Sequence, residues 1–305
     1  SKEFYKKYLK LINKKEKLNH YDKVLKLSLK INLDYYNYNF DYLPLDHENN
    51  PIAFFCESSS GKLYYTFKTH SDYYKFIEKT KYFSEYILTC IENMKLGIKK
   101  KIVLPKVLAK KLLDQIKDII KKKPYKNHNV PKNLKVDFNK EVENILDIIL
   151  KKLVKFLTET YIPKCRNTYG LSSLPNGDKM YLYSAKKFIC LKNISIEKVH
   201  NYGLKEVKRI YQEMIKIKNK MGFKGNLQDF NKDFLSRKDL KFKNRSDALN
   251  SYRKFLKEID KTIMKTQFKT KISHPCKITS VPKFNEEYAS SAYYIPGDIL
   301  GKRKG

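Results

Sequence analysis

Apolar residues recur every three or four positions along most of this 305-residue chain. One run with successive spacings of 3, 4, 3 and 4 contains Val207, Ile210, Met214, Ile217 and Met221. A second run with the same spacings contains Leu249, Tyr252, Leu256, Ile259 and Ile263. Such spacing places the apolar side chains on one face of an α-helix. We therefore expect a mainly α fold, a multi-helix body.

The same periodicity predicts further helices, and the exceptions to it are few. Helices are expected at residues 4–12 and 22–35, from Ser71 to Gly97, after Pro105, and from Phe138 to Tyr161. A further element is expected to begin at Ser195, Gly222 to end the helix that contains the first run, and Ser246 to cap the helix that contains the second. Residues 42–67 predict a long irregular loop, whereas residues 181–189 fit a helix or a strand. Only residues 277–282 and 290–295 are typical of strands, which predicts a small β element near the C-terminus.

The expected domain organisation follows from a polar connection around residues 124–133. We expect an N-terminal helical region at residues 1–135 and a second helical region at 136–305. The second region ends in the short β element. The two regions are expected to form one continuous domain.

Charge is the most biased feature of the composition. Lys and Arg total 65 against 32 acidic residues, a net charge of +33. A charge of this size attracts polyanions non-specifically. Only six of the basic residues are Arg, whose planar fork suits bases and phosphates better than Lys does. The excess of Lys is also typical of compositional drift, so both drift and a selected polyanion-binding surface stay open.

Cysteine usage and missing motifs exclude several classes of site. The five Cys are far apart and form no C-x-x-C pair, which favours a reducing compartment such as the cytoplasm. No apolar run approaches the ~18 residues of a membrane span. The sequence contains no H-E-x-x-H, G-x-S-x-G or G-x-G-x-x-G pattern. These residues alone predict neither a catalytic set nor a metal site.

A series of longer motifs carries a resemblance to a known family. The motifs are YIPKCRNTYGLSSLPNGDKMY at 161–181, ISIEKVHNYGLKEVKRIYQEM at 194–214, MGFKGNLQDF at 221–230 and ITSVPKFNEEYASSAYYIPGD at 278–298. In this order they resemble the family called domain of unknown function 885. Its members are similar to zincin-type metallopeptidases. The resemblance implies a helical body that walls a deep channel, with a small sheet beside a metal site.

The resemblance also implies where the metal belongs. In that family a zinc motif of the form HE-x-x-P-G-H lies C-terminal to a Tyr-Tyr-x-Pro motif, which here is formed by residues 293–296. No such zinc motif follows within these 305 residues. We therefore expect no catalytic residue, no metal ligand and no cofactor in this chain. Zinc is expected only if a longer protein carries the downstream motif. The chain is then the N-terminal part of that protein and is inactive alone.

The residues that match the family motifs are the candidates for contact with a peptide substrate. They are Tyr293, Tyr294, Arg303, Tyr181 and Asn176. Tyr293 and Tyr294 would lie at a sheet edge to which an extended peptide adds, and Arg303 would pair with a substrate carboxylate. Asn176 and Gly177 would form a tight turn because Gly permits a positive φ. Tyr181 suits either substrate contact or core packing.

Two other functions remain open at this stage. One is a non-catalytic basic helical protein that binds nucleic acid or another polyanion. The other is an inactive structural relative of the peptidases. The oligomeric state is not indicated by the sequence.

Overall fold

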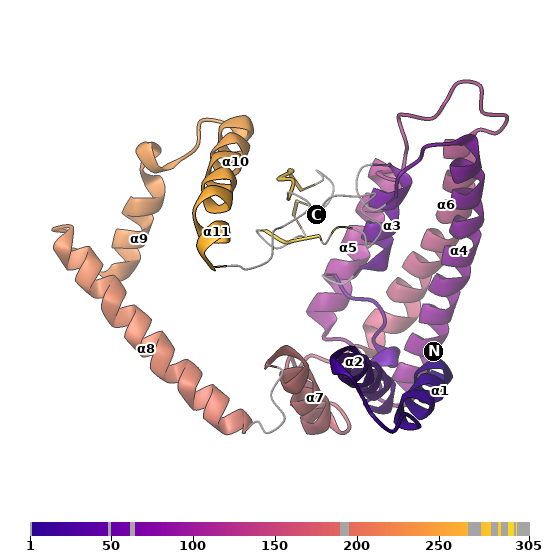
Figure 1. Cartoon of the computed structure of the whole chain (residues 1–305), viewed down its shortest axis with the longest axis horizontal. Helices are drawn as coiled ribbons and strands as arrows, with labels where there is room; N and C mark the ends of the chain where they lie inside the picture. Colours follow the sequence, from indigo (N-terminus) through magenta and orange to yellow (C-terminus); the bar gives the residue numbers. More distant parts are fainter. Residues whose placement is uncertain are drawn as a thin grey trace. The chain divides into compact units, whose positions relative to one another are not determined.

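The computed structural model describes residues 2–47, 50–61, 65–189, 195–267, 276–281, 286–287, 292–295 and 297. The chain forms two compact units, which are described separately (Figure 1). The first comprises Ser1–Lys192 with Pro282–Ser290, and the second comprises Asn193–Val281 with Ser291–Gly305. Helices dominate both units, so the expected mainly α fold is confirmed. The grouping into regions 1–135 and 136–305 stays a prediction.

The first unit is built from seven α-helices, counted over the described residues, and four short helical turns. The α-helices are α1 (Lys2–Asn13), α2 (His20–Asn37), α3 (Pro51–Ser59), α4 (His70–Lys99), α5 (Lys106–Lys122), α6 (Phe138–Phe156) and α7 (Gly177–Ile189). The short turns are η1 (Phe40–Tyr42), η2 (Leu157–Tyr161), η3 (Ile162–Lys164) and η4 (Leu171–Ser173). The helix expected from Phe138 to Tyr161 is thus α6, continued by the π-helical turn η2.

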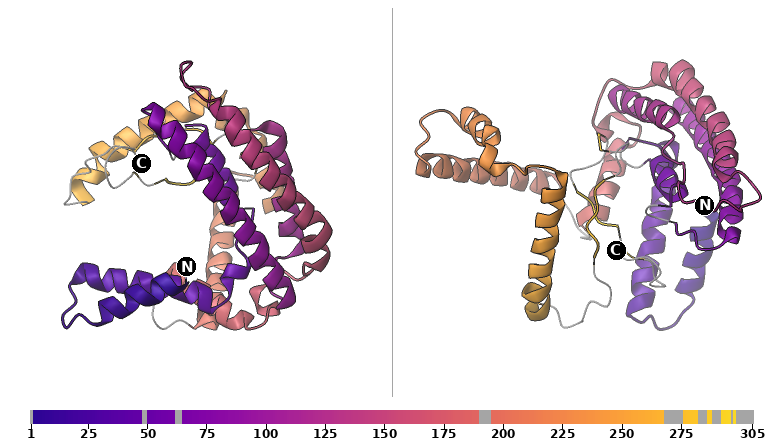
Figure 2. Two further views of the ribbon diagram at one scale, coloured as in Figure 1. Left: turned by 90° about the vertical axis from the view of Figure 1, so that its right-hand side faces the viewer. Right: turned by 90° about the horizontal axis from the view of Figure 1, so that it is seen from above.

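The core of this unit lies where α4 packs along α6, and α5 also contacts α6 (Figure 2). Aliphatic residues of α4, α5 and α6 are fully buried there, among them Ile87, Met94, Ile116, Leu146 and Leu150. Aromatic rings close one part of the core: the centroid of Tyr73 lies 4.5 Å from that of Phe67 and 5.2 Å from that of Phe138. Burial of each large apolar side chain contributes roughly 1.5–3 kcal/mol.

One helix was missed in the predicted irregular segment 42–67. There Pro51–Ser59 forms α3, which Asn50 caps by accepting a hydrogen bond from the Ile52 amide at 2.9 Å. The Asn50 amide nitrogen also donates to Gln115 Oε1 on α5 at 2.8 Å. An Asn before Pro at the first helical position is a start signal. The segment was expected to be irregular because its Pro and Ser residues are typical of loops and turns.

The start of α4 also differs from the prediction. The Thr69 and Lys68 amides both donate to the Asp72 carboxylate, at 2.8 and 3.0 Å, so the helix begins after Thr69 rather than at Ser71. These bonds lower the pKa of Asp72.

At its other end α4 continues past Gly97, which was expected to terminate it. The chain turns instead at Lys101, whose φ is +60°, and the Ile102 amide donates to the Gly97 carbonyl at 2.8 Å. A Cβ on Gly97 would lie 2.6 Å from the Ile102 carbonyl oxygen, so Gly97 is required by close packing.

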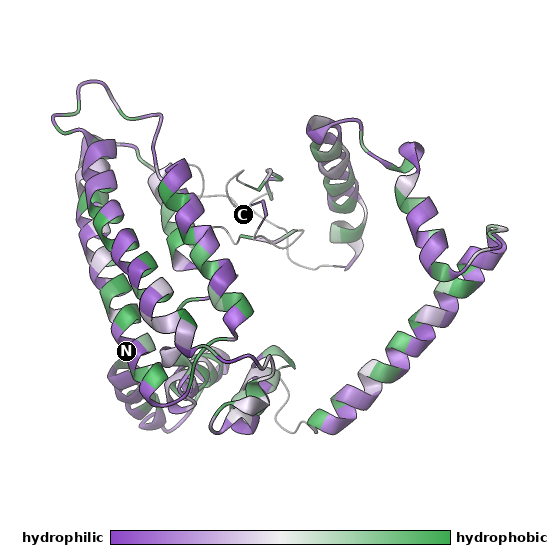
Figure 3. Ribbon diagram, turned by 180° about the vertical axis from the view of Figure 1, so that it is seen from behind, coloured by the Kyte–Doolittle hydropathy of each residue, from purple (hydrophilic) through white to green (hydrophobic). Residues whose placement is uncertain are grey.

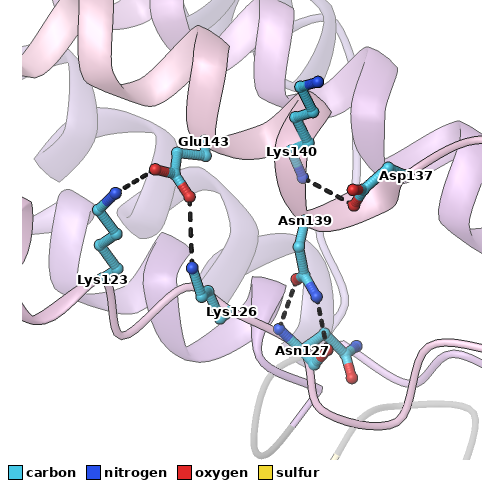
Figure 4. A network of polar contacts seen from close by, with 7 residues as sticks. All are labelled: Lys123, Lys126, Asn127, Asp137, Asn139, Lys140 and Glu143. Carbon is cyan, nitrogen blue, oxygen red and sulfur yellow. Dashed lines mark hydrogen bonds and ion pairs between the residues drawn. The ribbon is translucent and has the colours of Figure 1, made fainter.

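A polar network fixes the connection between α5 and α6 (Figure 4). Glu143 on α6 pairs with Lys123 and, at 3.5 Å, with Lys126. The Asn139 side chain accepts from the Asn127 amide at 2.8 Å and donates to the Asn127 carbonyl at 2.9 Å. Lys123 lowers the pKa of Glu143. This connection, expected to be exposed and polar, is therefore tied to the helix that follows it.

The second unit contains the helices α8 (Ile196–Lys220), α9 (Leu227–Ser236), α10 (Arg245–Lys261) and α11 (Ile263–Gln267), and the turn η5 (Lys238–Leu240). Ser195 caps α8 and Gly222, with φ +72°, follows its end, both as predicted. Asn244, not Ser246, caps α10. The expected C-terminal β element is not confirmed: residues 277–281 and 292–295 carry no strand, and residues 282, 290 and 291 lie outside the described part.

Candidate functional site

The segment from Tyr161 to Tyr181, which carries the longest family motif, is organised around Arg166. The Arg166 Nε donates to the Val103 carbonyl at 3.0 Å. Its Nη1 donates to the carbonyls of Thr168 and Gly170, at 2.7 and 2.8 Å, and to Ser173 Oγ at 3.0 Å. The Arg166 guanidinium thus holds the loop that contains Thr168, Gly170 and Ser173 next to Val103, which precedes α5.

Backbone contacts anchor the same loop. The Lys106 amide donates to the Arg166 carbonyl at 2.7 Å, and the Arg166 amide donates to the Leu104 carbonyl at 3.3 Å. The buried Tyr161 hydroxyl accepts from the Leu104 amide at 3.0 Å. Burial raises the pKa of Tyr161 and raises the pKa of Cys165 to about 11. Burial thus favours the thiol form of Cys165 near neutral pH.

Sequence reasoning missed Arg166, although a signal was present. Only six of the 65 basic residues are Arg. At Arg166 several donors of one rigid planar fork are used at once, which Lys does not offer.

Asn176 and Gly177 form the predicted tight turn, but their roles differ from the prediction. The positive φ, +56°, is at Asn176 rather than at Gly177. Gly177 is required for another reason: a Cβ there would lie 1.9 Å from the Leu171 carbonyl oxygen. The Met180 amide donates to the Asn176 carbonyl at 3.1 Å and so starts α7 from this turn. The Asn176 side chain is exposed beside the start of the helix.

For Tyr181 the sequence left two roles open, core packing and substrate contact, and α7 contains a second tyrosine, Tyr183, that bears on the choice. Tyr183 is buried, packs against the rings of Tyr38 and Phe40, and donates to the Ile31 carbonyl at 3.0 Å. Tyr181 is 50% exposed. Tyr183 therefore packs in the core, whereas the Tyr181 ring is exposed and accessible to a ligand. Asn176 and Tyr181 lie five residues apart on one segment.

The remaining candidates lie apart from this segment in the chain. Tyr293 and Tyr294 are 41% and 69% exposed and belong to the second unit. Arg303 lies outside the described residues. Asn176 and Tyr181 are thus neighbours in the chain and both exposed, and contact with a substrate stays a prediction for all five residues.

A buried carboxyl group, Glu57 on α3, was not predicted from the sequence. The Glu57 side chain is 1% exposed, and neither of its oxygens has a hydrogen-bond partner among the described residues. Burial raises the pKa of Glu57 to about 7. The neighbouring Cys56 is fully buried, and its pKa is also raised. The signal available in advance was the position of Glu57 four residues after the apolar Ala53.

A basic groove lies between α5 and α6. It is open and is lined by Lys117, Ile120, Lys151, Val154, Lys155, Thr158 and Glu159. Lys151 pairs with Asp147 at 3.1 Å. The remaining Lys ammonium groups make the groove a candidate site for an anionic ligand.

The described part of the chain does not fit a zinc ion. Within it, no three His, Cys, Asp or Glu side chains converge to hold a metal. Zinc sites in proteins use three or four such ligands, so no chemical step is assigned to zinc in these residues. Among the helices of the described ranges, none is long and apolar enough to cross a bilayer.

Comparison with known proteins places the chain in a family. Residues 2–305 match the family described as "Bacterial protein of unknown function (DUF885)", and the chain belongs to this family. No curated protein matches the sequence. The fold is similar to a crystal structure described as "the putative lipoprotein from Colwellia psychrerythraea", with a TM-score of 0.71 and 17% identity. The match covers 86% of this chain and 48% of the other, so this chain spans about half of that protein's length.

Proposed function

We propose that this chain is the N-terminal, substrate-channel portion of a metallopeptidase-like protein and binds peptides. The observation that carries the proposal is the segment held by Arg166, which presents Asn176 and Tyr181 to solvent within the longest family motif. Residues 2–305 match the family over its motif series, and the peptidase part of the proposal rests on the resemblance of those motifs to zincin-type peptidases alone.

The exposed groups suit a peptide ligand. The half-exposed Tyr181 ring offers an apolar surface at low entropic cost, and the Asn176 amide offers both a donor and an acceptor for a peptide group. Tyr293 and Tyr294 would add main-chain contacts with an extended peptide. Arg303 would pair with a carboxylate of the substrate.

The catalytic metal belongs, under this proposal, to polypeptide outside these 305 residues. When bound there, zinc would activate a water molecule for peptide hydrolysis. The residues of this chain bind and orient the peptide, and the chain alone is inactive.

Kinetics of the natural full-length protein test this function. Tyr181→Ala should lower kcat/KM for a peptide substrate by about 5- to 30-fold, the effect of losing one aromatic contact worth roughly 1–2 kcal/mol. The matched control is Tyr82→Ala on α4, because Tyr82 is 67% exposed and lies outside the motif segments. Equal kcat/KM for the two variants, or no peptide hydrolysis by the natural protein, would contradict the proposal.

A second candidate function is polyanion binding, which the basic groove between α5 and α6 favours. Lysines there would pair with phosphates, and the affinity would fall with salt by a log-log slope of about 0.9 per phosphate neutralised on duplex DNA. Lys117→Glu with Lys155→Glu should weaken binding of a DNA duplex at low salt. Lys79→Glu with Lys81→Glu on α4 is the charge-matched control. An absence of DNA binding at low salt would exclude this candidate.

A further inference from the structure

The basic groove between α5 and α6 combines exposed lysines with an apolar base. Lys117, Lys151 and Lys155 line it, and all three are exposed. Ile120 and Val154 also line it. Both are partly buried and pack against the core of the first unit, so they form the base of the groove. Figure 3 shows such hydrophilic and hydrophobic residues side by side on the helices of this unit.

The charges of the groove are mixed rather than uniformly positive. Lys151 pairs with Asp147 on the same helix, at 3.1 Å, and Glu159 lies among the lining residues. Lys117 and Lys155 pair with no acid in the described part of the chain. A ligand that fits the groove therefore brings negative charge to Lys117 and Lys155 and none to Glu159.

This pattern disfavours a nucleic acid and a bilayer. A nucleic-acid strand carries a charge at every phosphate and would place some of these charges near Glu159. No aromatic ring on which bases stack and no Arg that clamps a phosphate is among the lining residues. A bilayer presents a flat surface, which does not reach the base of a groove between two helices. A polypeptide, by contrast, can alternate acidic and apolar side chains from one residue to the next.

We propose that the basic groove binds an acidic polypeptide segment in which an apolar residue lies between carboxylates. The carboxylates pair with Lys117 and Lys155, and the apolar side chain contacts Ile120 and Val154. Exposed lysines supply attraction and select the sign of the charge, while the apolar base selects the residue between the charges.

The length of the groove sets the length of the segment. The lining residues from Lys151 to Glu159 extend about 12 Å at 1.5 Å per residue. An extended peptide covers this distance with roughly four residues at 3.3 Å each. None of the lining residues belongs to the segment 161–181, so the inference does not depend on the proposed peptidase-like function. It competes with nucleic acid for the same groove.

Fluorescence anisotropy of the 305-residue chain in about 0.15 M salt tests the inference, because this salt weakens non-specific attraction to the net charge. The probe is a labelled peptide of repeated Gly-Glu-Leu-Glu units. It should bind at least about threefold more tightly than the same peptide with Ser in place of Leu. It should bind at least about tenfold more tightly than the same peptide with Gln in place of Glu.

Two charge-reversal variants locate the binding site. Lys117→Glu with Lys155→Glu should weaken binding of the Leu-containing probe by about tenfold, because each attraction becomes a repulsion. Lys79→Glu with Lys81→Glu on α4 reverses two other exposed lysines. This control changes the net charge equally and should weaken binding by less than about twofold. Thermal unfolding checks that both variants are folded.

Several results would overturn the inference. Equal weakening by the two double variants would mean that net charge alone attracts the probe. Equal affinity for the Leu and Ser peptides would leave the apolar base without a role, and no measurable binding would leave the groove without this ligand. A DNA duplex that binds more tightly than the probe, and is weakened by the groove variant alone, would assign the groove to nucleic acid.

One further variant separates this inference from the proposed function. Tyr181→Ala lies outside the groove and should leave the affinity for the probe unchanged. A loss of affinity in Tyr181→Ala would place the probe on the segment held by Arg166 and would overturn the inference. An absence of peptide hydrolysis by the natural protein, together with groove-dependent binding of the probe, would refute the proposed function and leave this inference standing.

Discussion

Glu57 provides the sharpest test of how this fold is stabilised. Its carboxyl group is 1% exposed and unpaired among the described residues, and burial raises its pKa from 4.5 to about 7. In the unfolded chain Glu57 releases its proton near pH 4.5, whereas in the folded chain it keeps the proton up to about pH 7. The folded state thus binds more protons between these values. Its free energy of unfolding therefore falls as the pH rises from 4.5 to 7 and is level above pH 7.

The size of the effect follows from the shift. Each pKa unit corresponds to 1.36 kcal/mol, so the shift of Glu57 costs roughly 3 kcal/mol of stability at pH 8. Glu57→Gln removes the ionisable group with little change of shape. The variant should equal the wild type in stability at pH 4 and exceed it by up to roughly 3 kcal/mol at pH 8.

Thermal unfolding between pH 4 and pH 8 provides the assay. For a unit of this size, 3 kcal/mol corresponds to a rise in Tm of roughly 6–12 °C. Glu92→Gln is the control, since Glu92 forms an exposed pair with Lys95 on α4, and its Tm should follow that of the wild type. A difference between Glu57→Gln and wild type that does not change with pH would refute the reasoning, because it would mean that Glu57 is not buried as an isolated acid.

Two backbone predictions follow from the turns. Gly177→Ala should destabilise the first unit by roughly 3 kcal/mol or more, because the new Cβ would lie 1.9 Å from a backbone oxygen; urea unfolding measures this. Gly203→Ala in α8 has open space around the new Cβ and should be neutral or stabilising by roughly 0.5–1 kcal/mol, so equal losses in both variants would contradict the account. Lys101→Gly should raise the free energy of unfolding by about 1 kcal/mol, since Lys101 has a φ of +60°. Lys100→Gly, at a φ of −93°, should bring no gain, and a gain there but not at Lys101 would refute this explanation.

Local signals predicted most of the helical elements. The periodicity identified the helices that became α4, α5, α6, α8 and α10, and the start at Ser195 and the stop at Gly222 were correct. These features depend on neighbouring residues alone. Even so, two starts were displaced by two residues, because Thr69 and Asn244 also carry capping side chains and sequence alone does not rank them against Ser71 and Ser246.

The features that were missed, and the β element that is not confirmed, depend on packing contacts rather than on the pattern of neighbouring residues. Gly97 continues α4 because the Ile102 carbonyl approaches it, and the burial of Glu57 depends on how α3 packs. Neither contact is visible in a periodic pattern. The β element was inferred from β-branched and aromatic residues, whose preference for strands depends on a neighbouring strand to pair with.

The candidate site was predictable only in part. Resemblance identified Asn176 and Tyr181, and the structure exposes both on one segment. Tyr183 is buried and Tyr181 is exposed because of which side of α7 faces the core, and the sequence alone does not give that orientation. The hydrogen bonds of Arg166 to Val103 and Gly170 join positions that are far apart or lie in a loop, so no local pattern predicts them.

Metal content tests the central claim most directly, namely that this chain binds the peptide while the catalytic metal is held elsewhere. The 305-residue chain and the natural full-length protein are to be purified in parallel, supplied with zinc, passed over a desalting column and measured by mass spectrometry. The account predicts about one tightly bound zinc per full-length chain, lost together with peptidase activity on chelation, and no stoichiometric zinc in the 305-residue chain. Stoichiometric zinc in the 305-residue chain, or none in the full-length protein, would contradict it.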